Sequence, residues 1–253
     1  MPKQAPHGRF AWHELAVTEP SAAESFYLQV TPWKTQPWDH APDYTLLMNE
    51  STPLGGIACL SDDHVAGRLP QEWLPYVCVY DVDGCSRQAV SLGGQIRRGP
   101  KEVPNIGAWA VIADPQGALF GIYEPAYAPA PCAPKPGQFS WHELATSDYK
   151  AAAEFYRALF RWEHVSDYDM GEPGVYRMFG HRGETYGGMF NCTDTMPAPK
   201  WLPYMRVSDV KSAAGQVQQA GGTVTCGLMD VPGGDRIAHC LDPQGAAFAL
   251  HAR

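Results

Sequence analysis

The sequence of 253 residues contains no apolar run close to the ~18 residues that cross a bilayer, and only 18% of its residues are charged. No apolar segment follows the charges near the N-terminus, so no signal peptide is expected. The seven cysteines are odd in number and form no Cys-x-x-Cys pair, which disfavours a disulfide scaffold or a zinc ribbon. These absences predict a cytoplasmic protein with no membrane partner.

Several common chemistries also lack their sequence signals. There is no Gly-x-x-x-x-Gly-Lys-Ser/Thr loop, no Gly-x-Ser-x-Gly elbow and no Gly-x-Gly-x-x-Gly after a first strand. The net charge is −8, from 19 Lys and Arg against 27 Asp and Glu, and an acidic surface disfavours nucleic acid as a partner. Hydrophobic residues make up 45% of the chain, which is enough for a folded core.

The strongest positive signal is an internal repeat. Three pairs of segments recur in the same order at offsets of 128 or 129 residues, and in the first pair 11 of 20 positions are identical. The pairs are Gly8–Tyr27 with Gly137–Tyr156, Trp73–Val82 with Trp201–Val210, and Ala113–Ile122 with Leu241–Leu250. The segment between the halves is rich in proline, which favours an extended spacer. We therefore predict one domain over residues 8–124, a linker over 125–136 and a second domain over 137–253.

Each half shows the pattern strand, helix and three strands, twice over. In the second half, Asp148 and Asp209 are placed to cap helices, and Asp242 opens a Pro- and Gly-containing turn of a final hairpin. The prediction is an α+β fold of four βαβββ units in two tandem domains. The curved sheets are expected to be mostly antiparallel, with helices on the outer face and a cup on the other.

The segment Trp141–Trp162 carries Trp-His-Glu-Leu, then Ser-Asp, then Ala-Ala-x-x-Phe-Tyr-x-x-Leu-Phe-x-Trp. Together with the Asp-Pro-Gln-Gly hairpin, this pattern resembles the vicinal oxygen chelate superfamily, the glyoxalase, bleomycin-resistance and extradiol-dioxygenase group. It is most similar to the tandem-domain, glyoxalase-like or hydroxylase-labelled branch. The resemblance covers nearly the whole chain and implies the fold, whereas the reactions of the superfamily are diverse.

The resemblance also implies where a metal would be held, on the first and a late strand of each unit. Carried over by register, these positions lack oxygen, imidazole or thiolate donors, so no metal cofactor is expected. They are Trp12, Leu46, Leu74 and Gly121 in the first half, and Trp141, Met178, Leu202 and Ala249 in the second. A register slip brings in only His13 or His142, so a divalent metal stays as an alternative.

Strand alternation places the repeated Glu14 and Glu143 in the cup, where either carboxylate is a candidate general base or hydrogen-bond acceptor for a ligand. The competing interpretation is an Arg-paired or backbone-capping glutamate. His13 and His142 face the helices and are interpreted as structural. Aromatic residues with polar tips suit a flat organic ligand, with core packing as the alternative for many of them. The candidate ligand-binding residues are Trp12, Trp141, Tyr44, Tyr176, Trp73, Tyr76, Trp201, Tyr204 and Arg177.

Four hypotheses follow. The first is a cup that binds a small aromatic or polyketide-like molecule without a metal. The second is a lyase, isomerase or hydroxylase-like enzyme with Glu14 or Glu143 as base, and the third is a metal-dependent glyoxalase or extradiol dioxygenase. A non-enzymatic interaction protein is the fourth, which no sequence feature favours. Because two copies in one chain can pair as two subunits would, we expect a monomer with an internal pseudo-dimer, or a weak homodimer.

Overall fold

The computed structural model describes residues 7–39, 41–60, 70–126, 135–194 and 196–253. Most of the predicted linker, residues 127–134, lies outside the described residues. The first half contains β1 (Phe10–Val17), α1 (Pro20–Val30), β2 (Lys34–Trp38), β3 (Ala41–Asn49), β4 (Thr52–Cys59), β5 (Glu72–Cys78), α3 (Val82–Ser91), β6 (Gln95–Val103), β7 (Gly107–Ala113) and β8 (Leu119–Pro125). The second half contains β9 (Phe139–Thr146), α4 (Tyr149–Phe160), β10 (Glu163–Asp169), β11 (Val175–His181), β12 (Glu184–Asn191), β13 (Lys200–Arg206), α5 (Val210–Gln219), β14 (Thr223–Asp230), β15 (Arg236–Leu241) and β16 (Ala247–Ala252).

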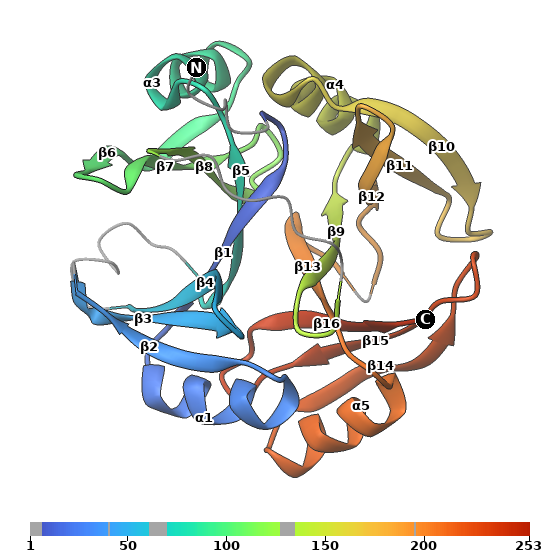
Figure 1. Cartoon of the computed structure of the whole chain (residues 1–253). Helices are drawn as coiled ribbons and strands as arrows, with labels where there is room; N and C mark the ends of the chain where they lie inside the picture. The colour runs from blue at the N-terminus through green and yellow to red at the C-terminus, as the bar shows by residue number, and fades with distance from the viewer. Residues whose placement is uncertain (1–6, 40, 61–69, 127–134, 195) are drawn as a thin grey trace. The chain divides into compact units, whose positions relative to one another are not determined.

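The strands form two sheets of eight, and the same strand order is repeated in each (Figure 1). The orders are β2-β3-β4-β1-β5-β8-β7-β6 and β10-β11-β12-β9-β13-β16-β15-β14. Most neighbours are antiparallel, while β1 with β4, β5 with β8, β9 with β12 and β13 with β16 are parallel. This confirms the predicted α+β fold of tandem βαβββ units. Of the helices in the described part of the chain, none is both long and apolar enough to cross a membrane.

The helix caps follow from local sequence. The carboxylate of Asp148 accepts hydrogen bonds from the backbone N–H groups of Lys150 and Ala151, and Asp209 accepts one from Ser212. Both satisfy N–H groups that a helix leaves unpaired at its first turn. The positions predicted for these two helix starts are confirmed.

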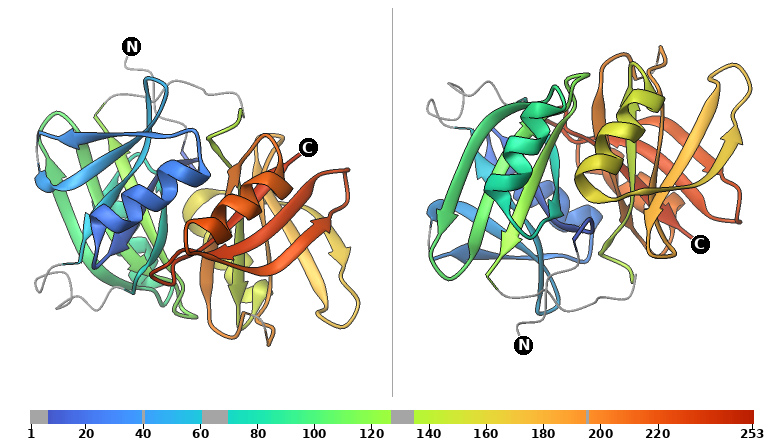
Figure 2. Two further views of the ribbon diagram at one scale, coloured as in Figure 1. Left: turned by 90° about the horizontal axis from the view of Figure 1, so that it is seen from below. Right: turned by 90° about the horizontal axis from the view of Figure 1, so that it is seen from above.

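The chain folds into two compact units, and these units do not coincide with the two sequence repeats. Unit 1 takes its described residues from 1–12, 75–131 and 142–201, and unit 2 takes its from 13–74, 132–141 and 202–253. Each unit therefore combines one βαβββ module from the first half with one from the second. In unit 2, α1 and α5 lie side by side, and in unit 1, α3 and α4 do (Figures 1 and 2).

A buried hydrogen-bonded chain joins the two modules of unit 2. The indole N–H of Trp73 donates to the Tyr27 hydroxyl at 2.8 Å, and that hydroxyl donates to the Asp242 carboxylate at 3.2 Å. The other carboxylate oxygen of Asp242 accepts the backbone N–H groups of Gln244 and Ala246. Burial raises the pKa of Tyr27 well above its usual value, so the phenol keeps its proton and remains a donor.

Unit 1 contains the equivalent series of hydrogen bonds, in which the two halves of the sequence exchange roles. Trp201 donates to the Tyr156 hydroxyl at 3.2 Å, and Tyr156 donates to Asp114 at 2.9 Å. Asp114 is 3% exposed, and burial raises its pKa despite the hydrogen bonds that it accepts. The Asp114 carboxylate therefore closes its own turn, through the backbone N–H groups of Gln116 and Gly117, and also binds a helix from the other half.

Candidate functional site

Strand alternation gives the first strand of each half two distinct faces. In β1, Leu15 and Val17 are fully buried against the helices, whereas Trp12 and Glu14 are half-buried on the opposite, helix-free face. In β9, Glu143 lies on the helix-free face but is only 7% exposed. The prediction that these residues turn away from the helices agrees with the burial pattern.

Tyrosine rings lie flat over glycines on the helix-free face. In unit 2, a Cβ added to Gly56 would overlap the ring of Tyr44, and in unit 1 a Cβ added to Gly188 would overlap Tyr176. Gly56 lies on β4, which pairs in parallel with β1, and Gly188 lies on β12, which pairs in parallel with β9. The missing side chain lets each ring lie close to the sheet, so the ring forms a flat apolar surface with a polar hydroxyl at its edge.

The second module of each half also has a tyrosine on this face, but Tyr76 and Tyr204 are only 4% and 2% exposed, which favours packing over ligand contact for both. In unit 1, Tyr76 covers Gly121, its register partner. In unit 2, Tyr204 pairs in register with Ala249, and its hydroxyl lies 2.9 Å from Nε2 of His239. The tyrosines could be expected from the sequence but His239 could not, because only the pairing of β13, β16 and β15 brings this histidine to Tyr204.

The best-defined polar pair on a helix-free face belongs to unit 1. The Tyr176 hydroxyl donates to Oε2 of Glu143 at 3.2 Å, and the Tyr176 ring stacks with Phe190 at a centroid distance of 5.9 Å. A nearly buried carboxylate is thus held by a phenol beside two aromatic rings. Such a group suits hydrogen bonding to a hydroxyl-bearing aromatic molecule.

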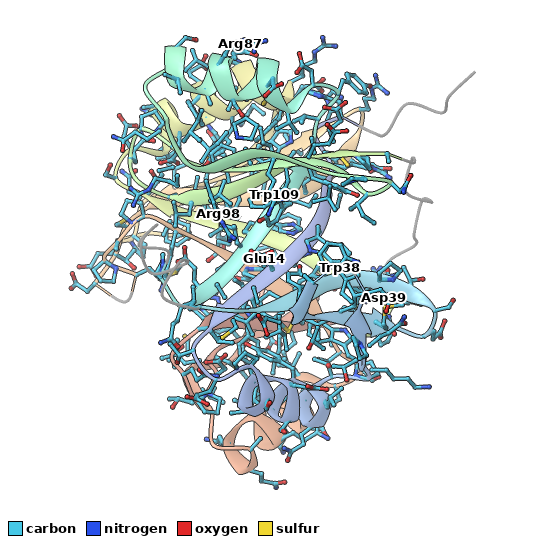
Figure 3. All side chains as sticks on the ribbon, turned by 90° about the vertical axis from the view of Figure 1, so that its left-hand side faces the viewer. Glu14, Trp38, Asp39, Arg87, Arg98 and Trp109 are labelled. Carbon is cyan, nitrogen blue, oxygen red and sulfur yellow. The ribbon has the colours of Figure 1, made fainter. Side chains whose placement is uncertain are left out.

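Other aromatic groups, which no sequence motif marks, extend these surfaces. In unit 1, the Arg98 guanidinium lies over the Trp109 ring, 5.2 Å from its centre, and Figure 3 shows the two side chains together on β6 and β7. In unit 2, Trp38 packs on Tyr44 at 5.2 Å. The cation–π contact holds the Arg98 guanidinium against the Trp109 ring.

Three predicted ligand-binding residues lie elsewhere. Trp73 and Trp201 are 1% and 4% exposed and belong to the buried hydrogen-bonded chains, which favours the core-packing interpretation. Arg177 forms two hydrogen bonds of 3.0 Å with Asp167 and lies over the ring of Tyr149, at the start of α4. Because successive strand residues point to opposite faces, Arg177 lies on the helix side and Tyr176 on the other.

The repeated histidines are buried and stack on phenylalanines from the opposite half. His13 stacks on Phe139 at 3.6 Å in unit 2, and His142 stacks on Phe10 at 3.5 Å in unit 1. Burial lowers the pKa of His142 to about 3, against a backbone contact with the Tyr186 carbonyl that opposes the shift. His142 is therefore neutral at physiological pH, in agreement with a structural role.

At the positions where the resemblance places metal ligands, the residues present do not fit a transition metal. These positions carry indole, thioether, aliphatic or glycine groups, none of which supplies the usual nitrogen, oxygen or thiolate donors. Within the described ranges of the chain, no three His, Cys, Asp or Glu side chains are grouped as metal ligands. Burial also raises the pKa of the thiols of Cys78, Cys85 and Cys240 to about 12, so they are poor ligands and nucleophiles.

Comparison with known proteins agrees with this architecture. CFP32 of Mycobacterium tuberculosis (strain CDC 1551 / Oshkosh), assigned by name to the glyoxylases, is 28% identical over 259 residues, which cover 99% of this chain and 97% of CFP32. The anthracycline biosynthesis protein DnrV of Streptomyces peucetius is 28% identical over 258 residues, covering 96% of this chain and 92% of DnrV.

Solved structures show the same fold at low sequence identity. The Mn(II)-bound glyoxalase from Novosphingobium aromaticivorans gives a TM-score of 0.69 at 13% identity, covering 98% of this chain and 82% of the glyoxalase. An extradiol ring-cleaving dioxygenase from B. fuscum gives a TM-score of 0.70 at 13% identity, covering 100% of this chain and 73% of the dioxygenase. The family model for the Glyoxalase/Bleomycin resistance protein/Dioxygenase superfamily matches residues 138–250. Residues 138–250 are thus a domain of that superfamily, and the chain as a whole has its vicinal oxygen chelate fold.

Proposed function

We propose that the protein binds a small planar organic molecule, of the aromatic polyketide kind, on the helix-free faces of its strands and without a metal ion. The observation that carries the proposal is the Glu143 carboxylate, nearly buried and held by Tyr176 beside Phe190. The rings supply flat apolar area, and the carboxylate accepts a hydrogen bond from a phenol or hydroxyl of the ligand. The similarity to DnrV supports this ligand class, because its name places it in anthracycline biosynthesis.

Fluorescence titration with an anthracycline tests the proposal. The intact protein is expected to show saturable quenching of tryptophan emission that is unchanged by added EDTA or Mn²⁺. Glu143→Gln keeps the size of the side chain but removes its charge, so it is expected to weaken binding about tenfold, or about 1.4 kcal/mol. The matched control is Glu154→Gln, on the exposed outer surface of α4.

Two results would contradict the proposal. One is quenching that does not saturate or is equal in both variants. The other is binding that appears only when a divalent metal is added.

A second candidate function is base catalysis by Glu143 or Glu14 on the bound molecule. The Glu143–Tyr176 hydrogen bond favours it, because a phenol beside a carboxylate can return the proton that the carboxylate removes. Chromatography of the anthracycline after incubation tests it. Product must form with the intact protein and be lost, under saturating ligand, in whichever of Glu143→Gln and Glu14→Gln lacks the base. Product formed by both variants at the rate of the intact protein would leave only the binding function.

A further inference from the structure

Three proton-handling side chains are joined in unit 2, apart from the Glu143 pair. The Ser140 hydroxyl lies 2.7 Å from Nδ1 of His251, and Nε2 of the same ring lies 3.2 Å from Oδ2 of Asp235. Ser140 belongs to β9, His251 to β16, and Asp235 directly precedes β15. We call this set the Ser140 relay.

The chemistry of the three groups fixes the direction of the hydrogen bonds. The Asp235 carboxylate only accepts, so the proton of a neutral His251 ring lies on Nε2. Nδ1 is then an acceptor, and the Ser140 hydroxyl donates to it at 2.7 Å in preference to the Tyr204 carbonyl, which lies farther away at 3.5 Å. A serine that donates to an imidazole whose other nitrogen is held by a carboxylate is the arrangement that activates a serine nucleophile.

The three side chains of the Ser140 relay are partly exposed, and the His251 ring is held in place by its neighbours. The His251 side chain is 14% exposed and Asp235 is 33% exposed, and Ser140 is half-buried. His251 is fixed on β16 by pairing with Ile237 of β15. The imidazole is thus held at two nitrogens and at its backbone, while the serine is not fully buried.

The first half lacks every member of this set. Its matching positions, at offsets of 129 or 128 residues, hold Ala11, Gly107 and Tyr123. Tyr123 instead donates to the Ile106 carbonyl at 2.9 Å, and burial raises the pKa of Tyr123 to about 12. Serine, aspartate and histidine are therefore present together in one half and absent together from the other, so the common fold does not require them.

The geometry points to an acyl-transfer site at Ser140 that takes small activated esters. As the Ser140 oxygen bonds to the ester carbonyl carbon, its proton moves to Nδ1 of His251. The carbon–oxygen bond to the alcohol then breaks, and the alcohol leaves with that proton. Water attacks the acyl-serine and gives a proton to Nδ1; the carboxylic acid leaves, and Ser140 recovers its hydroxyl hydrogen. Asp235 orients the ring and stabilises its charged form.

Labelling of the full chain with diisopropyl fluorophosphate, followed by peptide mass spectrometry, tests this site. We expect one label, on Ser140, and hydrolysis of p-nitrophenyl acetate above the rate in buffer. His251→Gln keeps the serine but removes the base, so labelling and hydrolysis are expected to slow by at least 10²-fold. Asp235→Asn is expected to slow both by a smaller factor.

Ser208→Ala, at an exposed serine of the same unit, is the matched control and is expected to leave both rates unchanged. Near-ultraviolet circular dichroism of each variant reports whether it folds. The assignment is overturned if a folded intact protein takes no label, if the label lies on another serine, or if folded His251→Gln reacts at the rate of the intact protein. These results are independent of anthracycline binding, so either proposal can fail alone.

Discussion

His142 gives the fold a built-in sensitivity to acid that one substitution is expected to remove. The ring is buried, stacks on Phe10 and has a pKa lowered to about 3 by burial, from an ordinary value of 6.5. Between these two values the unfolded chain binds a proton at this site and the folded chain does not. Stability from this group is therefore complete above pH 6.5 and is lost as the pH falls.

The size of the effect follows from the two pKa values. Between pH 7 and pH 4.5, the free energy of unfolding is expected to fall by about 2.5 kcal/mol through His142 alone. In His142→Phe the ring and its stacking on Phe10 remain, but nothing titrates. The variant loses the contact with the Tyr186 carbonyl, at a cost of about 1 kcal/mol at pH 7. At pH 4.5 the order of the two free energies of unfolding reverses, and His142→Phe is expected to be more stable than the intact protein.

Urea denaturation at half-unit steps from pH 7.5 to pH 4.5 measures this difference. The buried carboxylates titrate in both proteins, so subtracting the two curves isolates His142. The control is His164→Phe, at a surface histidine that is 53% exposed; the buried His142 remains in this variant, so the acid loss assigned to His142 is expected to persist. A constant difference between intact protein and His142→Phe over the whole range would refute the reasoning, because it would mean that the folded protein protonates this ring as readily as the unfolded chain.

Two further predictions concern buried groups. Tyr156→Phe leaves the Asp114 carboxylate and the Trp201 N–H without their shared partner, so the free energy of unfolding in urea is expected to fall by about 1–3 kcal/mol; an unchanged midpoint would contradict the role of this chain. In the native protein at pH 8, iodoacetamide is expected to modify the exposed Cys226 and to spare Cys78, whose pKa burial raises to about 12; mass spectrometry of the digested protein gives the two extents, and equal modification would show that Cys78 is accessible.

The fold could be predicted from the sequence because its signals are local and repeated. The caps at Asp148 and Asp209, the helix spacing between them and the Asp242 turn each depend on residues a few positions apart. Duplication strengthened the prediction, since each element was seen twice. The alternation of Leu15 with Glu14 also gave the faces of the first strand correctly.

The candidate site was harder to predict from the sequence, because its contacts join segments that are far apart in the chain. Tyr204 meets His239, and Ser140 meets His251, only through strand pairing, and no spacing in the sequence encodes either pair. The type of aromatic residue alone also could not distinguish a ring that lines a ligand site from a ring that packs in the core. Trp73 is surrounded by other rings in the core, which depends on the packing of unit 2.

The exchange of partners between the halves has a consequence for synthesis on the ribosome. The Tyr27 phenol binds the Asp242 carboxylate, 215 positions later, so the helix that carries Tyr27 leaves the exit tunnel long before its partner exists. Unit 2 can close only when almost the entire polypeptide has been made, whereas Asp114 meets Tyr156 much earlier. A gene cut at the proline-rich segment would yield two fragments that each carry half of both interfaces, and neither fragment could assemble a complete unit without the other.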